Sequence, residues 1–471
     1  METAPVDEAV RTARTAEARF LRAFAYFNMV KRYGGVPLIL KAQQLSDSPE
    51  ELYPKRATEE AVYQFILDEM NDIIDNRLLP DAYGAADLGR PTLYAAAALK
   101  SRAAMYAGSI ASWGTVQLDG LVGIPADKKE HFWQESLNAS NRLLYGSPFA
   151  LYEKYPDDRS KNYRNIFLDE NNCEVIFSEI YDGKSGKGHS WDMWQNPSGY
   201  NAWAGGQQNC VYLEFVESYE NIDGSDPTID REKVAQYYTW TLDELWGKKD
   251  PRFKASIYTQ GTPWTHEGAS VTLDYHVGIF VDGQWINDGF YEGVPALGVC
   301  ANNWRPTPFG ILKYLDESSA MIPERYYSKT DWIVFRLGEI YLNFAEAAFE
   351  LNKPDSALWA VNKIRARAGM PELQSITREQ IRHERKIELA FEGNRYWDVR
   401  RWRTAVQDLS HAWHGMRYKL DWATQKYYVE IVDNICGTPE PYFNEMHYYW
   451  PIAQSRTQQN PNLLPNNPGW R

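Results

Sequence analysis

The sequence predicts a mostly α-helical protein, in which a scaffold of paired helices carries a large loop-rich insertion with a few short strands. Two observations support this fold class. Apolar residues recur at helical spacing near both ends of the 471-residue chain, as in amphipathic helices. Between them the periodic patterns are short, and Gly, Pro, Asn, Asp and aromatic residues dominate. We expect an N-terminal helical scaffold at 1–145, a loop-rich region at 146–330, and a C-terminal helical scaffold with an extended tail at 331–471.

The N-terminal helices are indicated by apolar stripes and by their end signals. In "AEARFLRAFAYFNMV" the apolar residues recur at i, i+3, i+4 and i+7, and Gly34 and Gly35 end the helix. A second helix is expected to begin after Thr58, a side chain suited to an N-cap. Two more are predicted at "TLYAAAALKSRAAMYAGSIA", whose small residues let a neighbouring backbone approach, and at 131–145.

The C-terminal helices are predicted to form pairs joined by tight turns. "RLGEIYLNFAEAAFELN" is amphipathic, and Pro354 follows its end. "PDSALWAVNKIRARAGM" comes next and ends at Gly369, a residue favoured just past a helix C-terminus. A further helix is expected to begin at Thr377. Pairs of this kind, with Ala at the crossing points, resemble tetratricopeptide-type repeats, although no strict repeat of roughly 34 residues is visible.

The composition argues against several classes of function. The net charge of −13 opposes binding to a polyanion, so DNA, RNA and anionic membrane surfaces are not expected partners. No run of about 18 apolar residues occurs, and the N-terminus lacks the basic start and apolar core of a signal peptide. The protein is therefore expected to be cytosolic, or its chain begins inside a longer precursor.

The cysteines do not indicate a metal or redox site. They are widely spaced and contain no CxxC pair, so neither a zinc site nor a thioredoxin-type redox motif is predicted. We assign no metal-binding residue and no cofactor from the sequence. Free core thiols are the simpler interpretation, and two disulfides are the alternative in an oxidising compartment. The four are Cys173, Cys210, Cys300 and Cys436.

The charged stretch "IRHERKIELAFEGNRYWDVRRW" is predicted to have a structural role in the fold and no catalytic or nucleic-acid-binding role. Ile387 stands where the second His of an HExxH zinc motif would be, so metalloprotease chemistry is not indicated. Acidic and basic residues alternate too evenly for a nucleic-acid helix. Arg385–Glu388 and Glu392–Arg395 are spaced i,i+3, which predicts local salt bridges along one helix face.

Motifs of nucleotide and hydrolase chemistry are incomplete. Gly183-Lys184-Ser185 matches the end of a P-loop, but Ser178 stands where its first Gly should be. No GxSxG occurs. The acidic stretch "DGSDPTIDRE" does not have EF-hand spacing, which leaves a solvated loop or a loose calcium site. Because the sequence does not fix the separation of carboxylates, a glycoside hydrolase stays an alternative.

Aromatic residues in the loop-rich region are the main positive signal. The chain has 18 Trp and 31 Tyr. A flat ring can cover the C–H face of a sugar while amides, carboxylates and guanidinium groups bind its hydroxyls. The alternative is that each Trp fastens its own loop to the helices. The predicted stacking residues are Trp191, Trp194, Trp203, Trp285 and Trp304. The predicted polar rim is Tyr200, Tyr291, Asn196, Gln207 and Asn303, with Trp113 as a further candidate.

Several segments, in the same order along the chain, resemble one family, the SusD/RagB-like outer-membrane nutrient-binding lipoproteins of Bacteroidetes. The similarity covers nearly the whole chain. It is carried by "AEARFLRAFAYFNMVKRYGGVPLIL", "DPRFKASIYTQGTPW", "VFRLGEIYLNFAEAAFELN" with "ALWAVNKIRARAGM", "IRHERKIELAFEGNRYWDVRRW" and "YYWPIAQSRTQQNPNLLPNNPGW".

The resemblance implies a non-catalytic surface lipoprotein of the cell outer membrane. Such a protein would capture oligosaccharides and deliver them to a SusC-like TonB-dependent transporter. The resemblance also implies that Glu388, Glu392, Arg395 and Asp398 form internal ion pairs. Family members usually carry a signal peptide, a lipidated Cys and further helices before the "EARFLRA" segment, so we expect Met1 to be an internal start. Two rival functions are a glycoside hydrolase with an aromatic-lined cleft and a helical-repeat scaffold that binds proteins.

Overall fold

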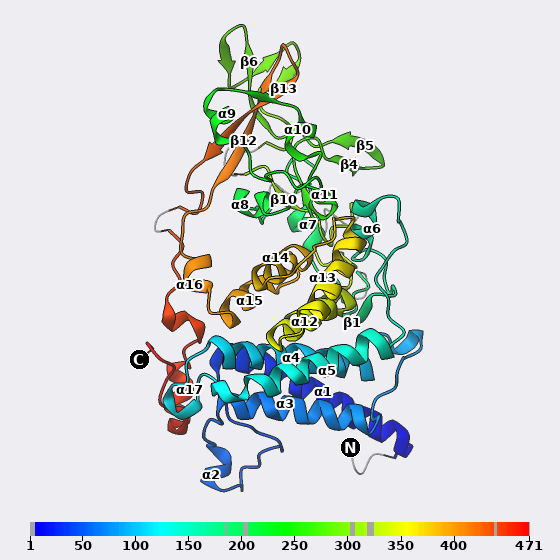
Figure 1. Cartoon of the computed structure of the whole chain (residues 1–471), viewed down its shortest axis with the longest axis vertical. Helices are drawn as coiled ribbons and strands as arrows, with labels where there is room; N and C mark the ends of the chain where they lie inside the picture. Colours follow the sequence, from blue (N-terminus) through cyan, green and yellow to red (C-terminus); the bar gives the residue numbers. More distant parts are fainter. Residues whose placement is uncertain are drawn as a thin grey trace.

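The computed structural model describes residues 5–183, 186–200, 206–301, 307–317, 325–437 and 440–470. Helices fill one half of the molecule along its longest axis, and a strand-bearing part fills the other half (Figure 1). Both ends of the chain lie on the helical half (Figure 1). The predicted fold class, a mostly helical scaffold with a loop-rich part and short strands, is confirmed.

The N-terminal helices pack side by side at one end of the molecule (Figure 1). They are α1 (Glu8–Tyr33), α3 (Glu59–Asp75), α4 (Leu93–Trp113) and α5 (Lys129–Gly146), and the short α2 (Pro49–Leu52) lies in the loop between α1 and α3. Thr58 and Thr92 cap α3 and α4, and each accepts a first-turn backbone N–H, at 3.1 and 3.3 Å. The small residues of α4 allow close packing on α5. A Cβ at Gly108 would lie 2.8 Å from the ring of Trp133, so only glycine fits there.

The C-terminal region begins with the predicted helix pair, α12 (Leu337–Glu350) and α13 (Pro354–Ala368), which lies above the N-terminal layer (Figure 1). The helices that follow are α14 (Arg378–Glu388), α15 (Arg395–Arg401), α16 (Ala405–Asp408) and α17 (Gln454–Gln459), the last of which lies beside the N-terminal layer. Gly369 ends α13 in the left-handed conformation, with φ of 79°, which glycine adopts without strain. Thr377 opens α14 with a capping box to Gln380. A turn with Gly393 at φ 73° then redirects the chain into α15.

The largest sheet joins segments from two of the three regions defined by sequence. Its order is β2-β13-β12-β6-β7. The strands are β2 (Thr239–Trp240), β6 (His276–Val281), β7 (Gln284–Ile286), β12 (Gly415–Asp421) and β13 (Lys426–Val432). β12 and β13 form a hairpin, and β12 lies parallel to β6 with Tyr418 opposite His276. This hairpin was not predicted, and 331–471 is therefore more than helices and an extended tail.

The remaining loop-rich chain is built from short elements. Its helices are α6 (Arg159–Asn165), α7 (Trp191–Gln195), α8 (Leu213–Glu217), α9 (Arg231–Ala235), α10 (Leu242–Trp246) and α11 (Pro251–Ser256). Its two-stranded pairs are β1 (Val175–Glu179) with β11 (Trp332–Arg336), β3 (Ile257–Tyr258) with β10 (Gly310–Ile311), β4 (Pro263–His266) with β5 (Ala269–Thr272), and β8 (Phe290–Tyr291) with β9 (Val294–Pro295). The segment 251–256 is the helix α11 because Asp250 caps it and Pro251 starts it.

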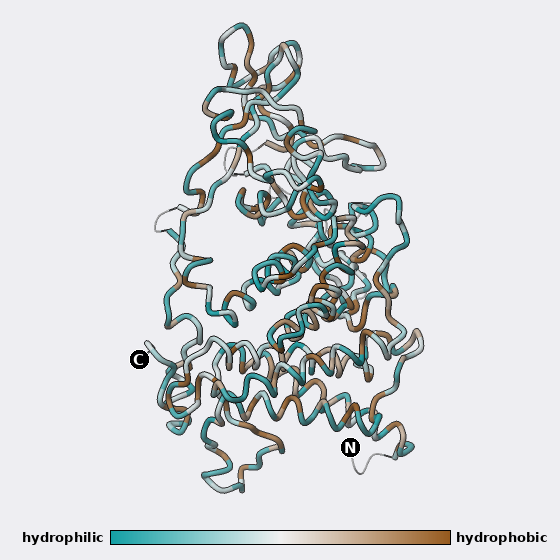
Figure 2. Tube along the Cα trace, viewed as in Figure 1, coloured by the Kyte–Doolittle hydropathy of each residue, from teal (hydrophilic) through white to brown (hydrophobic). Residues whose placement is uncertain are grey.

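Two large apolar cores stabilise these halves. One lies among α1, α3, α4, α5 and α12, and the other lies beneath the five-stranded sheet. Hydrophobic and hydrophilic residues alternate along the helices, as expected when one face of each is buried (Figure 2). No disulfide joins the four cysteines. Within the described ranges, no helix has the length and apolar character needed to cross a bilayer.

Candidate functional site

The predicted aromatic site centres on α7, a short helix held by two other segments. His189, just before α7, forms a β-bridge with Ser328, and its Nε2 lies 2.9 Å from the carbonyl oxygen of Thr330. Asp192 accepts a hydrogen bond from the backbone N–H of Asp316 at 2.9 Å. The 307–317 and 325–331 segments thus fix the helix in place.

The two tryptophans of α7 have different surroundings. Trp191 is half-buried between two apolar clusters, and its indole N–H donates to the carbonyl oxygen of Lys313 at 3.2 Å. Trp194, one helical turn later, has the guanidinium of Arg325 5.5 Å from its ring centre. A ring with a cation nearby and a partly exposed face can receive a sugar. Trp191 therefore fastens the helix, and Trp194 is better placed as a platform.

The residues that flank segments 201–205 and 302–306 contact one another next to α7. Gly199, which leads into residues 201–205, has φ of 84°, and a Cβ there would lie 2.3 Å from the carbonyl oxygen of Val299. At the other end, Gln207 donates from Nε2 to the carbonyl oxygen of Thr307 at 3.3 Å. Val299 and Thr307 flank residues 302–306. Both ends of the first loop therefore contact the matching ends of the second.

Three predicted site residues belong to these two loops. Trp203, Asn303 and Trp304 lie outside the described residues. The structure gives the positions of the residues that flank these segments. Their contact brings together the flanks of two Trp-bearing segments that are about one hundred residues apart in sequence. No property of the sequence reveals this pairing.

Two of the predicted rim residues are buried, which corrects their expected role. Asn196 and Gln207 are both fully buried, and the backbone N–H of Gln207 donates to the carbonyl oxygen of Asn196 at 2.7 Å. The Oε1 of Gln207 accepts from the hydroxyl of Tyr275 at 3.0 Å. In this conformation neither side chain meets solvent, so they close the base of the loop instead of forming a rim. Of the predicted rim, Tyr200 stays partly exposed, with its ring 5.0 Å from that of His266.

Trp285 and Tyr291 lie on strands, Trp285 in β7 of the five-stranded sheet and Tyr291 in β8, which pairs with β9. The ring of Trp285 packs against Phe280 and Tyr428, with centroids 4.9 and 5.3 Å away. The ring of Tyr291 meets Trp422 edge-on at 5.1 Å. The five-stranded sheet lies at the far end of the molecule from the helical layer (Figure 1).

Trp113 is in a third place, at the end of α4 in the helical scaffold. Its ring meets Trp133 edge-on at 6.1 Å, and the guanidinium of Arg382 lies 4.7 Å from its centre. It lines a pocket formed with the C-terminal tail. The structure thus distributes the predicted aromatic residues over three regions.

A polar cavity lies next to α7. It has a volume of about 750 Å³. Its walls include Asp316 and Thr330, the residues that bind Asp192 and His189, together with Lys154, Asp169 and Asn172. Burial raises the pKa of Asp192 to about 7, although its hydrogen bonds from Asp316 and Ser328 oppose that shift. The site residues predicted from sequence did not include these polar groups, because no sequence pattern indicates that an isolated Asp or Lys lines a cavity.

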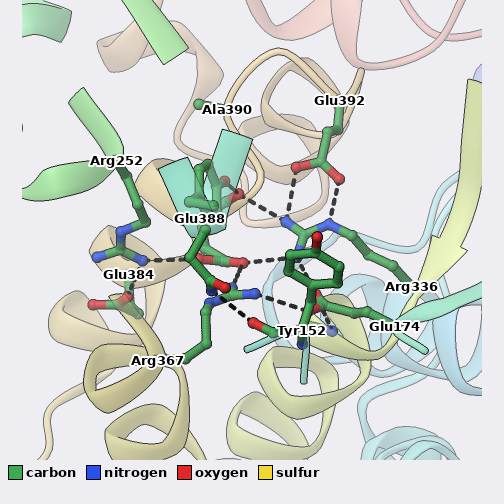
Figure 3. A network of polar contacts seen from close by, with 12 residues as sticks. Tyr152, Glu174, Arg252, Arg336, Arg367, Glu384, Glu388, Ala390 and Glu392 are labelled. Carbon is green, nitrogen blue, oxygen red and sulfur yellow. Dashed lines mark hydrogen bonds and ion pairs between the residues drawn. The ribbon is translucent and has the colours of Figure 1, made fainter. Parts of the chain in front are cut away.

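The charged stretch forms a buried network, not a catalytic cluster (Figure 3). Glu388 binds Arg336 at 2.7 Å and Arg252 at 2.9 Å, and it also contacts Arg367. Burial alone would raise the pKa of Glu388, but these three arginines hold it below its ordinary value. Glu392 binds Arg336 at 2.7 Å and Lys313 at 2.8 Å.

The partners in this network differ from the local pairs expected from sequence. Arg385 binds Asp398 at 2.9 Å, and Arg395 lies 3.5 Å from Asp408. The predicted i,i+3 pairs assume a solvent-exposed helix face. Here the carboxylate face of α14 is buried against α11, β11 and α13, whose arginines supply the partners of Glu388.

Comparisons with known proteins place the chain in a family. The model described as the SusD family matches residues 173–470, and a model described as starch-binding associating with outer membrane matches residues 4–105. The chain belongs to the SusD family.

Individual relatives are distant. A SusD-like protein of Bacteroides ovatus is 24% identical over 422 residues, which is 88% of this chain and 64% of that protein. The chain thus spans less than two thirds of that relative's length. The crystal structure of a SusD-like protein from Bacteroides fragilis has a TM-score of 0.76 at 26% identity and covers 99% of this chain and 82% of its own. A SusD-like carbohydrate binding protein of the same species has a TM-score of 0.70 at 24% identity, with coverage of 98% and 81%.

Proposed function

We propose that this protein is a non-catalytic glycan-binding protein that captures oligosaccharides at the cell surface. The observation that carries the proposal is that the residues flanking two Trp-bearing segments, 201–205 and 302–306, contact one another next to α7. Gly199 meets Val299 at one end of the loops, and Gln207 meets Thr307 at the other. Aromatic rings from two adjoining loops can hold successive faces of a sugar chain, while neighbouring polar groups bind its hydroxyls.

The proposed ligand surface follows from these positions. Trp194, Tyr200, Trp203 and Trp304 would contact sugar rings, and Asn303 would bind hydroxyl groups. Trp191, Asn196 and Gln207 would hold these elements in place through the hydrogen bonds described above. Trp285 and Tyr291 would extend the surface only for a long ligand. Membership of the SusD family and the carbohydrate-binding relative of known structure support the choice of ligand class.

The location and partner of the protein are also part of the proposal. The match to a model described as associating with outer membrane supports an outer-membrane lipoprotein that faces the outside. We infer that it passes its ligand to a SusC-like TonB-dependent transporter. Copurification from outer membranes of the native organism, with a tag on the C-terminus of the whole protein, tests this part. A transporter enriched over an untagged strain supports the assignment, and its absence contradicts it.

Retardation in native gels cast with single polysaccharides tests glycan binding. Wild type, Trp203→Ala and Trp359→Ala would be run on a panel of neutral and acidic glycans. Trp359 is the control, because it lies in the helical scaffold, where it is half-buried and stacks on Tyr145. We expect at least one glycan to retard wild type and Trp359→Ala, with reduced retardation of Trp203→Ala.

The same glycan would be incubated with the protein and assayed for new reducing ends. The proposal expects none, because binding without hydrolysis leaves the chain length unchanged. Reducing ends above the level of a heat-denatured sample would instead favour the glycoside hydrolase. Equal mobility of wild type in every gel would contradict the glycan-binding proposal.

A further inference from the structure

A second pocket lies on the helical scaffold, where the end of α4 meets the C-terminal tail. Its volume is about 370 Å³, within the usual range for small-molecule sites. None of its lining residues belongs to α7 or to the two aromatic loops. The lining side chains used below are Trp113, Gln117, Arg403, Glu445, Tyr448 and Tyr449.

Arg403 occupies a position where the backbone favours glycine. It follows Trp402, the C-cap residue of α15, and has φ of 59°. A residue just past a helix end in this left-handed conformation is usually Gly, because a Cβ is strained there. The arginine therefore carries a conformational cost, which suggests that its side chain has a role that glycine cannot fill.

The guanidinium of Arg403 is held in place without an ion pair. It lies 4.6 Å from the ring centre of Tyr448, and its Nη2 donates to the hydroxyl of Tyr449 at 2.7 Å. That hydroxyl in turn donates to the buried carboxylate of Glu59 at 2.7 Å. Across the described chain, Arg403 forms no ion pair, and neither does Glu445 on the same pocket wall. A guanidinium has five N–H groups, so most of those on Arg403 remain for a ligand.

Trp113 supplies an apolar wall to the same pocket. Arg382 lies over its ring at 4.7 Å, and Trp133 meets its edge, so the ring is fixed in orientation. In the part of the chain that the structure describes, the indole N–H of Trp113 has no acceptor. Gln117 adds an amide at the rim. The pocket thus combines an aromatic wall, an arginine without a carboxylate partner and hydrogen-bonding groups.

We propose that this pocket binds a uronic acid residue. The sugar carboxylate would accept two N–H groups of Arg403, and the C–H face of the ring would lie against Trp113. Gln117 and Glu445 would bind ring hydroxyls. The positive charge of Arg403 favours this class of sugar. The chain as a whole has a net charge of −13, so an anionic ligand needs a local cation of this kind.

Calorimetric titration with free glucuronate, a glucuronosyl disaccharide and glucose tests the proposal. The key variant is Arg403→Gly, which removes the guanidinium and also relieves the backbone strain, so it is expected to fold. Arg77→Gly is the matched control. Arg77 also has a left-handed φ, 49°, but it is ion-paired with Asp81 on the surface near the end of α3.

We expect wild type and Arg77→Gly to bind a uronate at least about tenfold more tightly than Arg403→Gly does, and glucose to bind weakly to all three. Binding of the disaccharide as well as glucuronate would identify a glycan chain end as the ligand, and binding of glucuronate alone would identify the free sugar acid. Equal uronate affinity of wild type and Arg403→Gly, no uronate binding, or equal affinity for glucose would overturn the proposal. Trp203→Ala is expected to leave uronate binding in this pocket unchanged. The proposal for this pocket and the proposal for the aromatic-loop site can therefore be contradicted independently of each other.

Discussion

Gln207 donates a hydrogen bond to the carbonyl oxygen of Thr307 and thereby joins the bases of two loops that are far apart in sequence. Its backbone has φ of 55°, and its Oε1 accepts from the hydroxyl of Tyr275. Both polar ends of the buried amide are therefore used. Gln207 is a clamp, and the geometry of the proposed glycan site depends on it.

Replacement of this clamp by Gln207→Leu should lower both stability and glycan affinity. The leucine fills a similar volume but removes the hydrogen bonds to the Thr307 carbonyl and from the Tyr275 hydroxyl, at a cost of about 1–3 kcal/mol in unfolding free energy. Urea unfolding and gel retardation would measure the two effects. Gln425→Leu is the control and should change neither, because Gln425 has a similar left-handed φ of 54° but an exposed side chain in the turn between β12 and β13. A Gln207→Leu protein with wild-type stability would show that the clamp is dispensable.

The two tryptophans of α7 are predicted to respond differently to substitution. Trp194→Ala should weaken glycan binding by about 1 kcal/mol, roughly fivefold, with little change in melting temperature, because its ring is the proposed platform. Trp191→Phe removes the indole N–H that binds the Lys313 carbonyl and should lower unfolding free energy by about 1 kcal/mol. Calorimetry with ligand and thermal unfolding separate the two roles. A loss of stability in Trp194→Ala together with a loss of glycan affinity in Trp191→Phe would contradict the proposed roles of the two residues.

Asp192 should make the stability of the protein pH-dependent. Its pKa is raised from 3.8 to about 7 by burial. The folded state therefore binds a proton that the unfolded state releases at lower pH, so the contribution to stability is full below pH 4 and is lost as pH rises to about 7. The expected loss is on the order of 4 kcal/mol.

Asp192→Asn tests this directly, because asparagine stays neutral. Unfolding free energies from urea titration at pH 4 to 8 would be compared with those of wild type. We expect the difference between the two proteins to be small at pH 4 and to grow in favour of the variant up to about pH 7. A difference that does not vary with pH would mean that Asp192 does not titrate in this range.

Breaking the buried ion network should be strongly destabilising. Glu388→Gln leaves the arginines at positions 252, 336 and 367 partly without counter-charge, which typically costs about 3–5 kcal/mol. Thermal or denaturant unfolding would measure the loss. Glu51→Gln is the control: its ion pair with Lys41 is on the surface, and its removal should have almost no effect. If both variants lost a similar, small amount of unfolding free energy, the structural role of the network would be contradicted.

The helices were predictable because their signals are local. Thr58, Thr377 and Gly369 mark helix ends by chemistry that acts within one turn. The hairpin of β12 and β13 was missed although apolar and charged residues alternate in β12 from Met416 to Leu420, which is the pattern of a half-buried strand.

Long-range relationships were not predictable from local patterns. The arginines around Glu388 come from three separate segments, and the contact between Gln207 and Thr307 spans 100 residues. For the same reason the sequence marked Asn196 and Gln207 as polar but not as buried. Arg403 was missed because its left-handed backbone is a property of the folded chain.

The central claim is that the two paired loops bind one glycan. The most direct measurement is calorimetric titration of a short oligosaccharide, taken from a polysaccharide that retards the wild type, into wild type, Trp203→Ala, Trp304→Ala and the control Trp359→Ala. We predict that each loop variant binds the same oligosaccharide about 1–2 kcal/mol more weakly than wild type and the control do, with unchanged melting temperatures. Wild-type affinity in both loop variants would contradict the account.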